Sequence, residues 1–560
     1  MNRTRSTPSA PPLAAPWQRI ATARISRRRA LAAAGAGALA TGAMAIAGCD
    51  GGTDDKRGGT LRFGTSVPLG SGLDPQVQSG TGLAIVGRAY GYLFHLDSRD
   101  DSLILDHAES VEQPDETTYV IRLRDDLRFH DVAPANGRKL NATDVAMSIE
   151  RFRDNPLVVN KTRHTTLLDA VGPTDERTLV LKTKRPNVYS LHALGDITAG
   201  AIFPKESIDG NIDATPGGPA SGPFAFAESA LPSRVRLERF GGYHGAAPPA
   251  EAMEWQIYDD DGAPVNSLND KFIDILACRD RAQFDAAASL GGGIVTSREP
   301  ALSWLSLGMD TSSTPFSDAR VRRAADLAID RAALIEQLAF GDGALAAPVS
   351  RTLGGGFWAL TEQEIAVAQG APMTPAERTA EARRLLEAAG AVEVPFALQV
   401  SDQPELRDAA AAVAADLRRA GFFPIVQPLP LLAWYVNYRA GDFAMTLISH
   451  LPYESPDTPM RMLHSAGPDG TASPFGMRDE ALDRLVERSW AESDRAARRD
   501  TVVEAQRRAL EARPLIHLFS GVSYAAAWDY VRDWQPELPG SLAFYDTGMS
   551  LDLPVEGRPD

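Results

Sequence analysis

Residues 103–134 read LILDHAESVEQPDETTYVIRLRDDLRFHDVAP, and this stretch carries the strongest fold signal in the chain. Within it, residues 117–124 alternate apolar and polar side chains directly after an acidic turn. Such alternation, bounded by turn residues, is typical of a half-buried strand. Residues 178–183 repeat the pattern after a second acidic turn, and residues 61–65 show it as well. We therefore expect strands in all three segments.

Helix-start signals mark two further segments. Residues 141–152 begin with an acidic version of the capping signal ahead of a periodic apolar run. Thr374 precedes a proline at the first helical position and Glu377 at the third, and Gly390 follows the apolar-periodic run. These signals predict a short helix in the first segment and a helix over 375–389 in the second.

A strand–helix–strand unit follows. Residues 395–400 alternate as a strand, 406–420 form a helical pattern that ends at a glycine, and 422–427 are a second apolar run. Residues 443–449 are another strand candidate, and 479–513 carry a long helical pattern. Because strands alternate with helices here, the chain is expected to have a mixed α/β fold.

Length and charge limit the possible classes of protein. A chain of 560 residues is too long for one hydrophobic core, and its 44% apolar and 23% charged residues are ordinary for a folded protein. Residues 1–49 contain seven arginines and no acidic residue, so the rest of the chain carries 50 basic against 73 acidic side chains. This negative balance argues against nucleic acid as a partner.

The N-terminus has the features of an export signal. Arg27 and Arg28 precede the weakly apolar stretch 32–47. The two arginines and this stretch together resemble a twin-arginine signal. A transmembrane helix is the alternative, but alanine and glycine dominate this stretch and would hold poorly in a bilayer. We therefore expect residues 1–49 to direct export.

The export signal ends in a candidate lipidation site. The residues Ile-Ala-Gly that precede Cys49 resemble a bacterial lipobox, in which the cysteine thiol receives a diacylglyceryl group. Residues 50–59 are polar and glycine-rich, as expected of a flexible tether. With Cys49 lipidated, Cys278 is the remaining cysteine, so no intramolecular disulfide is expected and Cys278 is interpreted as a small buried side chain.

Taken in order, several motifs resemble the family 5 substrate-binding proteins of ABC importers, the large peptide- and nickel-type receptors. The resemblance covers about residues 58–550 and lies in GGTLRFGTSVPLGSGLDPQ (58–76), GRAYGYLFHLD (87–97), the opening stretch 103–134, ATDVAMSIERF (142–152), SGPFAF (221–226) with the following Tyr243 and His244, the strand 255–258, and PFSDARVRRAADLAIDRAALIE (315–336). Motifs in this order behind a lipobox make coincidence implausible.

The resemblance implies an α/β, two-lobed periplasmic-binding-protein-like fold of the large peptide-binding type. Lobe 1 would span 60–305 with an inserted subdomain, lobe 2 would span 306–520, and 521–560 would return to lobe 1. Hinge strands near 302–309 and 517–528 would join the lobes, which close over a ligand. The resemblance further implies a monomeric, non-enzymatic receptor without a cofactor that delivers a peptide-like solute to a membrane permease.

Peptide-binding relatives place a ligand-pairing acid in a segment of the form Asp-Tyr-x-Asp-Pro. Here the corresponding residues are 453–458, Tyr-Glu-Ser-Pro-Asp-Thr, which puts Glu454 at the position that pairs with the ligand ammonium and makes Tyr453 and Asp457 candidate contacts. A charge-assisted hydrogen bond of this kind contributes about 1.5–3 kcal/mol. The segment departs from the pattern at Leu451, Ser455 and Thr458, which puts ordinary di- or oligopeptide binding in doubt.

Aromatic and histidine residues supply the other candidates. Trp434 and Tyr435 precede the strand at 443–449, and Trp304 and Trp358 flank the predicted crossing between lobes. These four side chains could line a ligand site or form the core, and the sequence does not decide between the two. His450 and His464 bracket the same segment, but the nine histidines lack metal-ligand spacing, so no metal site is predicted.

Other functions remain open. An exported hydrolase would suit the size, but we find no GxSxG, HExxH or phosphate-binding loop motif. A family receptor for a nickel chelate, an opine or an oligosaccharide is the nearer alternative. A receptor that has lost transport and serves in signalling or as a chaperone would also keep the fold and the anchor.

Overall fold

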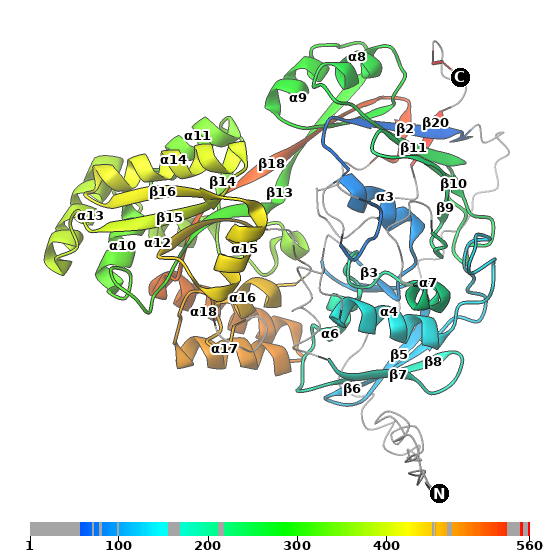
Figure 1. Cartoon of the computed structure of the whole chain (residues 1–560), viewed down its shortest axis with the longest axis horizontal. Coiled ribbons are helices and arrows are strands. Elements are labelled where there is room, and N and C mark those ends of the chain that lie inside the picture. Colours follow the sequence, from blue (N-terminus) through cyan, green and yellow to red (C-terminus); the bar gives the residue numbers. More distant parts are fainter. Residues whose placement is uncertain are drawn as a thin grey trace, which may run out of the picture.

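The computed structural model describes residues 57–69, 72–77, 81–97, 100–154, 168–210, 218–450, 453, 455–467, 473–534, 549–552 and 558–559. Arg27, Arg28, Cys49 and Glu454 lie outside these residues, so the predictions made for them concern parts of the chain that the structure does not describe. Figure 1 shows two bodies side by side, and one large sheet runs from one into the other. None of the described helices is both long and apolar enough to cross a membrane.

Lobe 1 is built on half of this sheet, in the order β12-β2-β11-β10-β9. The strands are β2 (Thr60–Thr65), β9 (Phe224–Ala230), β10 (Arg234–Arg239), β11 (Ala252–Ile257) and β12 (Ile275–Cys278). Phe63 of β2 stacks on Trp255 of β11 with ring centroids 4.8 Å apart, because the two residues are partners in a parallel pair. The expected strand at 61–65 is therefore confirmed.

Helices cover this half of the sheet and build two separate apolar clusters. α3 (Thr81–Ala89) packs into a core with Leu61 and Met253. α8 (Ala263–Asn269) and α9 (Arg281–Ala288) form a second cluster with Leu276 and Ala526. Cys278 is half-buried rather than fully buried, and burial raises the pKa of its thiol to about 12.

The opening stretch of sequence forms the core of an inserted subdomain. A four-stranded sheet in the order β5-β6-β8-β7 consists of β5 (Ala108–Asp115), β6 (Thr118–Leu123), β7 (Leu168–Pro173) and β8 (Thr178–Thr183). The helix α4 (Ala142–Asp154) packs on this sheet and begins where the sequence predicts, because Asn141 Oδ1 accepts from the Thr143 amide at 3.0 Å. Both strands expected here are present as β6 and β8.

Lobe 2 contains the predicted strand–helix–strand unit. β15 (Pro395–Ser401) and β16 (Phe423–Leu429) are parallel, and α14 (Pro404–Arg419) connects them. α13 (Pro375–Ala389) has the predicted bounds, because Thr374 and Glu377 form a reciprocal capping box and Gly390 adopts φ 66° at the C-terminus. β17 (Met445–His450) confirms the last strand candidate.

The helical pattern at 479–513 forms two helices instead of one. α17 (Glu480–Ala491) ends before α18 (Arg495–Ala512) begins. Asp494 interrupts the run because its carboxylate accepts from the Ala497 amide at 2.8 Å and so caps a new helix.

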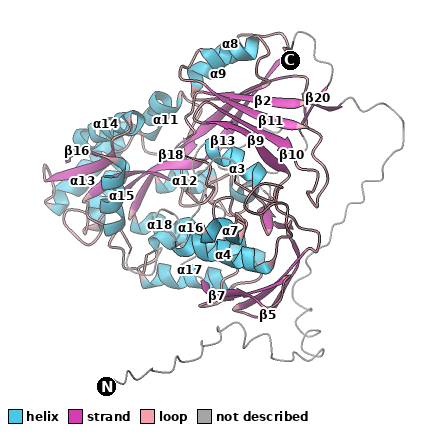
Figure 2. Cartoon of the chain, turned by 45° about the vertical axis from the view of Figure 1, so that its right-hand side comes forward, coloured by secondary structure: helices cyan, strands magenta, loops and turns pink. Residues whose placement is uncertain are grey.

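Smaller elements make up the rest of the described secondary structure. They are β1 (Arg57–Gly58), β3 (Phe94–Leu96), β4 (Leu103–Leu105), α6 (Ser190–Leu194), α7 (Lys205–Asp209), α10 (Ala319–Ala328), α11 (Arg331–Ala339), β14 (Ala344–Leu345), η1 (Leu353–Gly356), α12 (Glu362–Ala368), α15 (Leu431–Ala440), α16 (Asp457–Leu463), β19 (Val531–Arg532) and β20 (Ser550–Asp552). Figure 2 shows that helices surround the strands of lobe 2. In lobe 1, the sheet of the inserted subdomain, with β5 and β7, lies at the end away from β2 and β11 of the large sheet.

Two long strands join the lobes. β13 (Ile294–Met309) and β18 (Leu515–Trp528) pair antiparallel along most of their length and run from one body into the other (Figure 1). Their register shifts on either side of Trp304, which divides the pair into a lobe 1 part and a lobe 2 part. The segments expected to cross between the lobes, 302–309 and 517–528, lie in these two strands.

The lobes also touch at a second place. Asp101, next to β4, accepts from the indole of Trp358 at 2.8 Å and pairs with Arg495 at 2.6 Å. Tyr189 packs into the same apolar cluster as Trp358 and Trp490 of lobe 2. The lobes are therefore in contact in this structure at a site distant in sequence from the hinge strands.

Candidate ligand-binding site

An aromatic cluster lies where the hinge strand β13 meets β17. Trp304 stacks on His450, its cross-strand partner, with ring centroids 4.2 Å apart and planes 8° apart. The ring of Tyr453 meets Trp304 edge-on at 5.2 Å. Directly opposite residues of antiparallel strands have neighbouring side chains, so the pairing register brings these rings together. Among the residues predicted from sequence, Trp304, His450 and Tyr453 form one group.

The indole of Trp304 has an unusual hydrogen-bonding state. Its Nε1 is buried and has no acceptor among the described residues. A buried donor without a partner costs about 1–3 kcal/mol, so an acceptor from a bound molecule would stabilise the protein here. Trp304 is 5% exposed, and a solute therefore reaches this N–H only when the surrounding segments move apart.

His450 is a neutral imidazole. Its Nε2 and the Ser306 hydroxyl are hydrogen-bonded, and burial together with the nearby His517 lowers the pKa of His450 to about 3. His464 lies 3.4 Å from Glu487 and 3.9 Å from Asp483, in a different environment. His450 and His464 are not part of one metal-binding group among the described residues.

The flanks of Glu454 belong to the interior of lobe 2. Tyr453 is buried, and its hydroxyl accepts from the Ser350 amide. Ser455 on the other side is also buried. The side chain of Tyr453 thus contributes its ring to the aromatic cluster, while its hydroxyl is already engaged within the lobe.

Asp457 has internal partners for both carboxylate oxygens. It is the first residue of α16, where one oxygen pairs with Arg461 and the other accepts from the Trp490 indole. These contacts hold α16 against α17. A direct contact between Asp457 and a ligand is a prediction that would require this pairing to rearrange.

The aromatic residues Trp434 and Tyr435 lie on α15. Trp434 Nε1 donates to Thr446 Oγ1 at 2.9 Å, and its ring stacks on Tyr438 at 5.5 Å. Both residues are half-buried, so each has a face toward solvent. Trp358 is fully buried and makes the contact with Asp101 between the lobes, so it belongs to the core.

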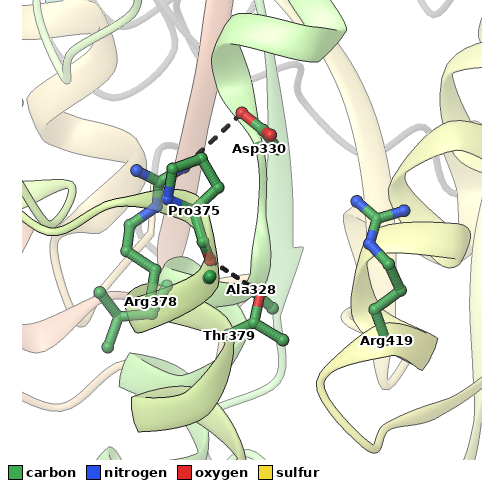
Figure 3. A pocket seen from close by; sticks show the side chains of 8 residues that line it. Ala328, Asp330, Pro375, Arg378, Thr379 and Arg419 are labelled. Carbon is green, nitrogen blue, oxygen red and sulfur yellow. Dashed lines mark hydrogen bonds and ion pairs between the residues drawn. The ribbon is translucent and has the colours of Figure 1, made fainter.

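A cavity of about 220 Å³ lies elsewhere in lobe 2. It is lined by residues of α10, α13 and α14 and the turn between α10 and α11, including Asp330, Arg378 and Arg419 (Figure 3). Arg378 lies 3.6 Å from Asp330. None of the candidate ligand-binding residues predicted from the sequence lines this cavity. It is therefore not the candidate site.

Comparison with known proteins identifies the class. The profile of the bacterial extracellular solute-binding proteins, family 5 Middle, matches residues 102–472, and the chain belongs to this family. The family resemblance inferred from the motifs is thereby confirmed. Its homologues are binding proteins and not enzymes.

The relatives are named for different ligands. The chain is 25% identical over 249 residues to the dipeptide-binding protein of Escherichia coli, covering 41% of this chain and 46% of that relative. It is 22% identical over 480 residues to the heme-binding protein A of Haemophilus influenzae, covering 80% and 83%. The dipeptide-binding relative is thus matched over less than half of its length.

Solved structures confirm the two-lobed fold. A periplasmic binding protein from Helicobacter pylori in complex with the peptide STSA superposes with a TM-score of 0.71 at 18% identity, covering 89% of this chain and 99% of that one. The binding protein AgaA of A. tumefaciens in complex with agropinic acid gives a TM-score of 0.69 at 22% identity, covering 88% and 98%.

Proposed function

We propose that the protein is a receptor that captures a peptide or peptide-like solute by closure of its two lobes and delivers it to the membrane permease of an ABC importer. The observation that carries this proposal is the pair of strands β13 and β18, which joins the lobes and changes register at Trp304. A register break in a two-strand crossing is a natural place for a hinge. Membership of the solute-binding family supports the same function.

The ligand would lie between the lobes against the aromatic cluster. Trp304 offers a buried N–H that has no acceptor within the described part of the chain, and Trp434 and Tyr435 on α15 offer half-buried rings. Glu454 is proposed to pair with a ligand ammonium, and it follows Tyr453 of the same cluster. A carboxylate, an indole N–H and aromatic surfaces suit a molecule with a free amino group, carbonyl oxygens and apolar parts.

Export and anchoring are part of the proposal. Arg27 and Arg28 would direct twin-arginine export, and Cys49 would carry the lipid that holds the receptor at the outer face of the cytoplasmic membrane. Metabolic labelling with a radioactive fatty acid should mark the protein, and Cys49→Ser should abolish the label. Labelling of Cys49→Ser would show that another residue carries the lipid, and absence of label from the native protein would contradict a lipid anchor.

Thermal unfolding against a ligand panel tests the substrate class. The panel contains tripeptides with free amino ends, the same peptides N-acetylated, oligosaccharides, opines and nickel chelates, added to protein stripped of carried-over solute. A solute at 100 times its Kd stabilises the native state by about 2.7 kcal/mol, which shifts the transition measurably. We expect free peptides to stabilise the protein and acetylated ones to do so less.

Glu454→Gln tests the proposed contact. This variant should weaken binding of free peptides by about one to two powers of ten and remove their advantage over acetylated peptides. Glu387→Gln, a change on the exposed face of α13, serves as the matched control and should leave binding unchanged. Stabilisation by sugars, opines or chelates alone would refute the peptide assignment but keep the receptor, whereas no response to any panel member would favour a receptor without transport.

A further inference from the structure

Three imidazoles converge on one carboxylate in lobe 1, far in sequence from the hinge strands. Asp106 follows β4, and its Oδ2 lies 3.0 Å from Nε2 of His95 in β3 and 3.1 Å from Nδ1 of His107. Its Oδ1 lies 2.9 Å from Nε2 of His244, which follows β10. Strand β3 lies below α3 in the right-hand body of Figure 1. The four side chains therefore come from three separate segments of the chain.

This cluster is shielded from solvent. The exposed fractions of the side chains are 12% for His95, 4% for Asp106, 1% for His107 and 5% for His244. Ligand atoms of Asp106, His107 and His244 all lie within 4.8 Å of one another, and no other such group occurs among the described residues. His95 is not a member of this group, and its imidazole reaches the cluster through Asp106 Oδ2.

Further polar groups hold the cluster from outside. The Tyr243 hydroxyl donates to Asp106 Oδ1 at 3.0 Å, and the second ring nitrogen of His107, Nε2, lies 3.0 Å from Ser221 Oγ. A Cβ at Gly91 would lie 2.1 Å from His107 Nε2, so the ring fits because this residue is glycine. Such outer partners orient the ligands of protein metal sites and fix the histidine tautomer.

The donor set matches a particular ion. Two imidazoles and one carboxylate supply three ligand atoms, a set that Zn²⁺ accepts with its fourth position open to another ligand. Zinc lies about 2.0–2.1 Å from imidazole nitrogen, so the ligand atoms of a tetrahedral site are about 3.3 Å apart. His107 Nδ1 and His244 Nε2 lie 3.1 and 2.9 Å from carboxylate oxygens of Asp106, a few tenths of an ångström shorter than this separation. Calcium and magnesium prefer oxygen ligands and fit this set poorly.

We propose that Asp106, His107 and His244 bind one Zn²⁺ in lobe 1, with His95 as an outer partner of Asp106. The ion would tie the β3–β4 hairpin, which leads into the inserted subdomain, to the loop after β10 of the large sheet. Its role is to stabilise lobe 1, and it is separate from the solute that the receptor carries. The proposal therefore stands or falls independently of the proposed function.

Metal content and cobalt spectroscopy test the site in the intact protein. We expect the untagged protein, stripped with chelator and dialysed against Zn²⁺, to retain one zinc per chain by elemental mass spectrometry. Replacement by Co²⁺ should give the intense visible absorption of a four-coordinate cobalt ion. This spectrum is measured on the native sequence, so it does not depend on whether a variant folds.

Variants locate the ion. His244→Gln should weaken zinc binding at least about tenfold because it removes a ligand, and His95→Gln should weaken it about tenfold because it removes an outer partner of Asp106. His464→Gln is the matched control, because this imidazole also lies near two carboxylates but belongs to lobe 2. No stoichiometric zinc, a six-coordinate cobalt spectrum, or a loss in His464→Gln alone would overturn the proposal. The cluster would then be a hydrogen-bonded hub around Asp106.

Discussion

The imidazoles of His450 and His517 are both buried in lobe 2. Burial lowers the pKa of each to about 3, and the largest further influence is His517 for His450 and Arg331 for His517. An unfolded histidine titrates near 6.5, so the unfolded chain binds more protons than the native protein between about pH 6.5 and 3. The free energy of unfolding must therefore fall as the pH is lowered through this range.

Replacing one of these histidines should reduce that pH dependence. Each contributes a loss of about 2 kcal/mol between about pH 7 and 5, and His450→Gln removes one contribution while keeping a partner for Ser306. Urea unfolding of the native protein and the variant at both pH values measures the difference. An equal loss in both proteins would show that His450 does not titrate on unfolding in this range.

The indole N–H of Trp304 gives a second prediction for a single residue. Trp304→Phe keeps an aromatic ring but removes the donor, so it should weaken binding of a stabilising panel peptide about fivefold, the value of one neutral hydrogen bond. Trp528→Phe is the control, because its N–H already donates to the Leu268 carbonyl at 2.8 Å. Isothermal titration that shows equal affinities for the native protein and Trp304→Phe would remove Trp304 from the site.

Residues of the site were only partly predictable from sequence. Motif position led to Tyr453, Glu454 and Asp457, but a pattern gives no information on internal partners such as Arg461 and Trp490, which engage Asp457. The His95–His244 cluster was missed because its members are 149 positions apart at the extremes, and they meet only through the fold of lobe 1. A sequence reveals a metal site when its ligands recur at short, regular spacing. The residues of this cluster have no such spacing.

At the scale of elements, a buried carboxylate links the C-terminal residues to lobe 1. Asp274 is fully buried and accepts from Arg558 Nε at 2.9 Å, from the Arg62 amide at 2.8 Å and from the Tyr530 hydroxyl at 3.0 Å. These partners come from β2, the region after β18 and the end of the chain. One side chain thus joins three distant segments.

Arg558→Met should therefore destabilise the protein. The change leaves Asp274 buried without its cation, which costs about 3 kcal/mol of unfolding free energy. Arg484→Met is the control, since Arg484 forms an exposed pair with Glu480 at 3.5 Å whose loss costs less than about 0.5 kcal/mol. Equal urea midpoints for the two variants would contradict a structural role for the Arg558–Asp274 pair.

Elements with strong local signals were predictable, and those set by packing were not. α13 has its predicted bounds because the capping box of Thr374 and Glu377 and the left-handed Gly390 are local features. The break between α17 and α18 was missed because Asp494 is one polar residue in a polar run, and it acts as a cap only once the chain turns there. The family resemblance implied the crossing segments 302–309 and 517–528, but not the pairing of β13 with β18, which joins residues more than 200 positions apart.

For the whole molecule, the contacts between the lobes determine which interactions break and form when the lobes open and close. The hinge strands keep the lobes joined, while Asp101 with Trp358 and Arg495 forms a second contact that must break if the lobes separate. A bound solute shifts such an equilibrium by its difference in affinity between the open and closed states. The arrangement of the lobes in solution should therefore depend on ligand.

Small-angle X-ray scattering tests this claim most directly. It would be recorded on the purified protein stripped of solute, with and without a saturating concentration of the tripeptide that gives the largest thermal stabilisation. The account predicts a fall in the radius of gyration on addition of that peptide, and a smaller fall with its N-acetylated form at the same concentration, because the acetylated form binds more weakly. An unchanged radius with the peptide bound would contradict a receptor that works by closing its two lobes.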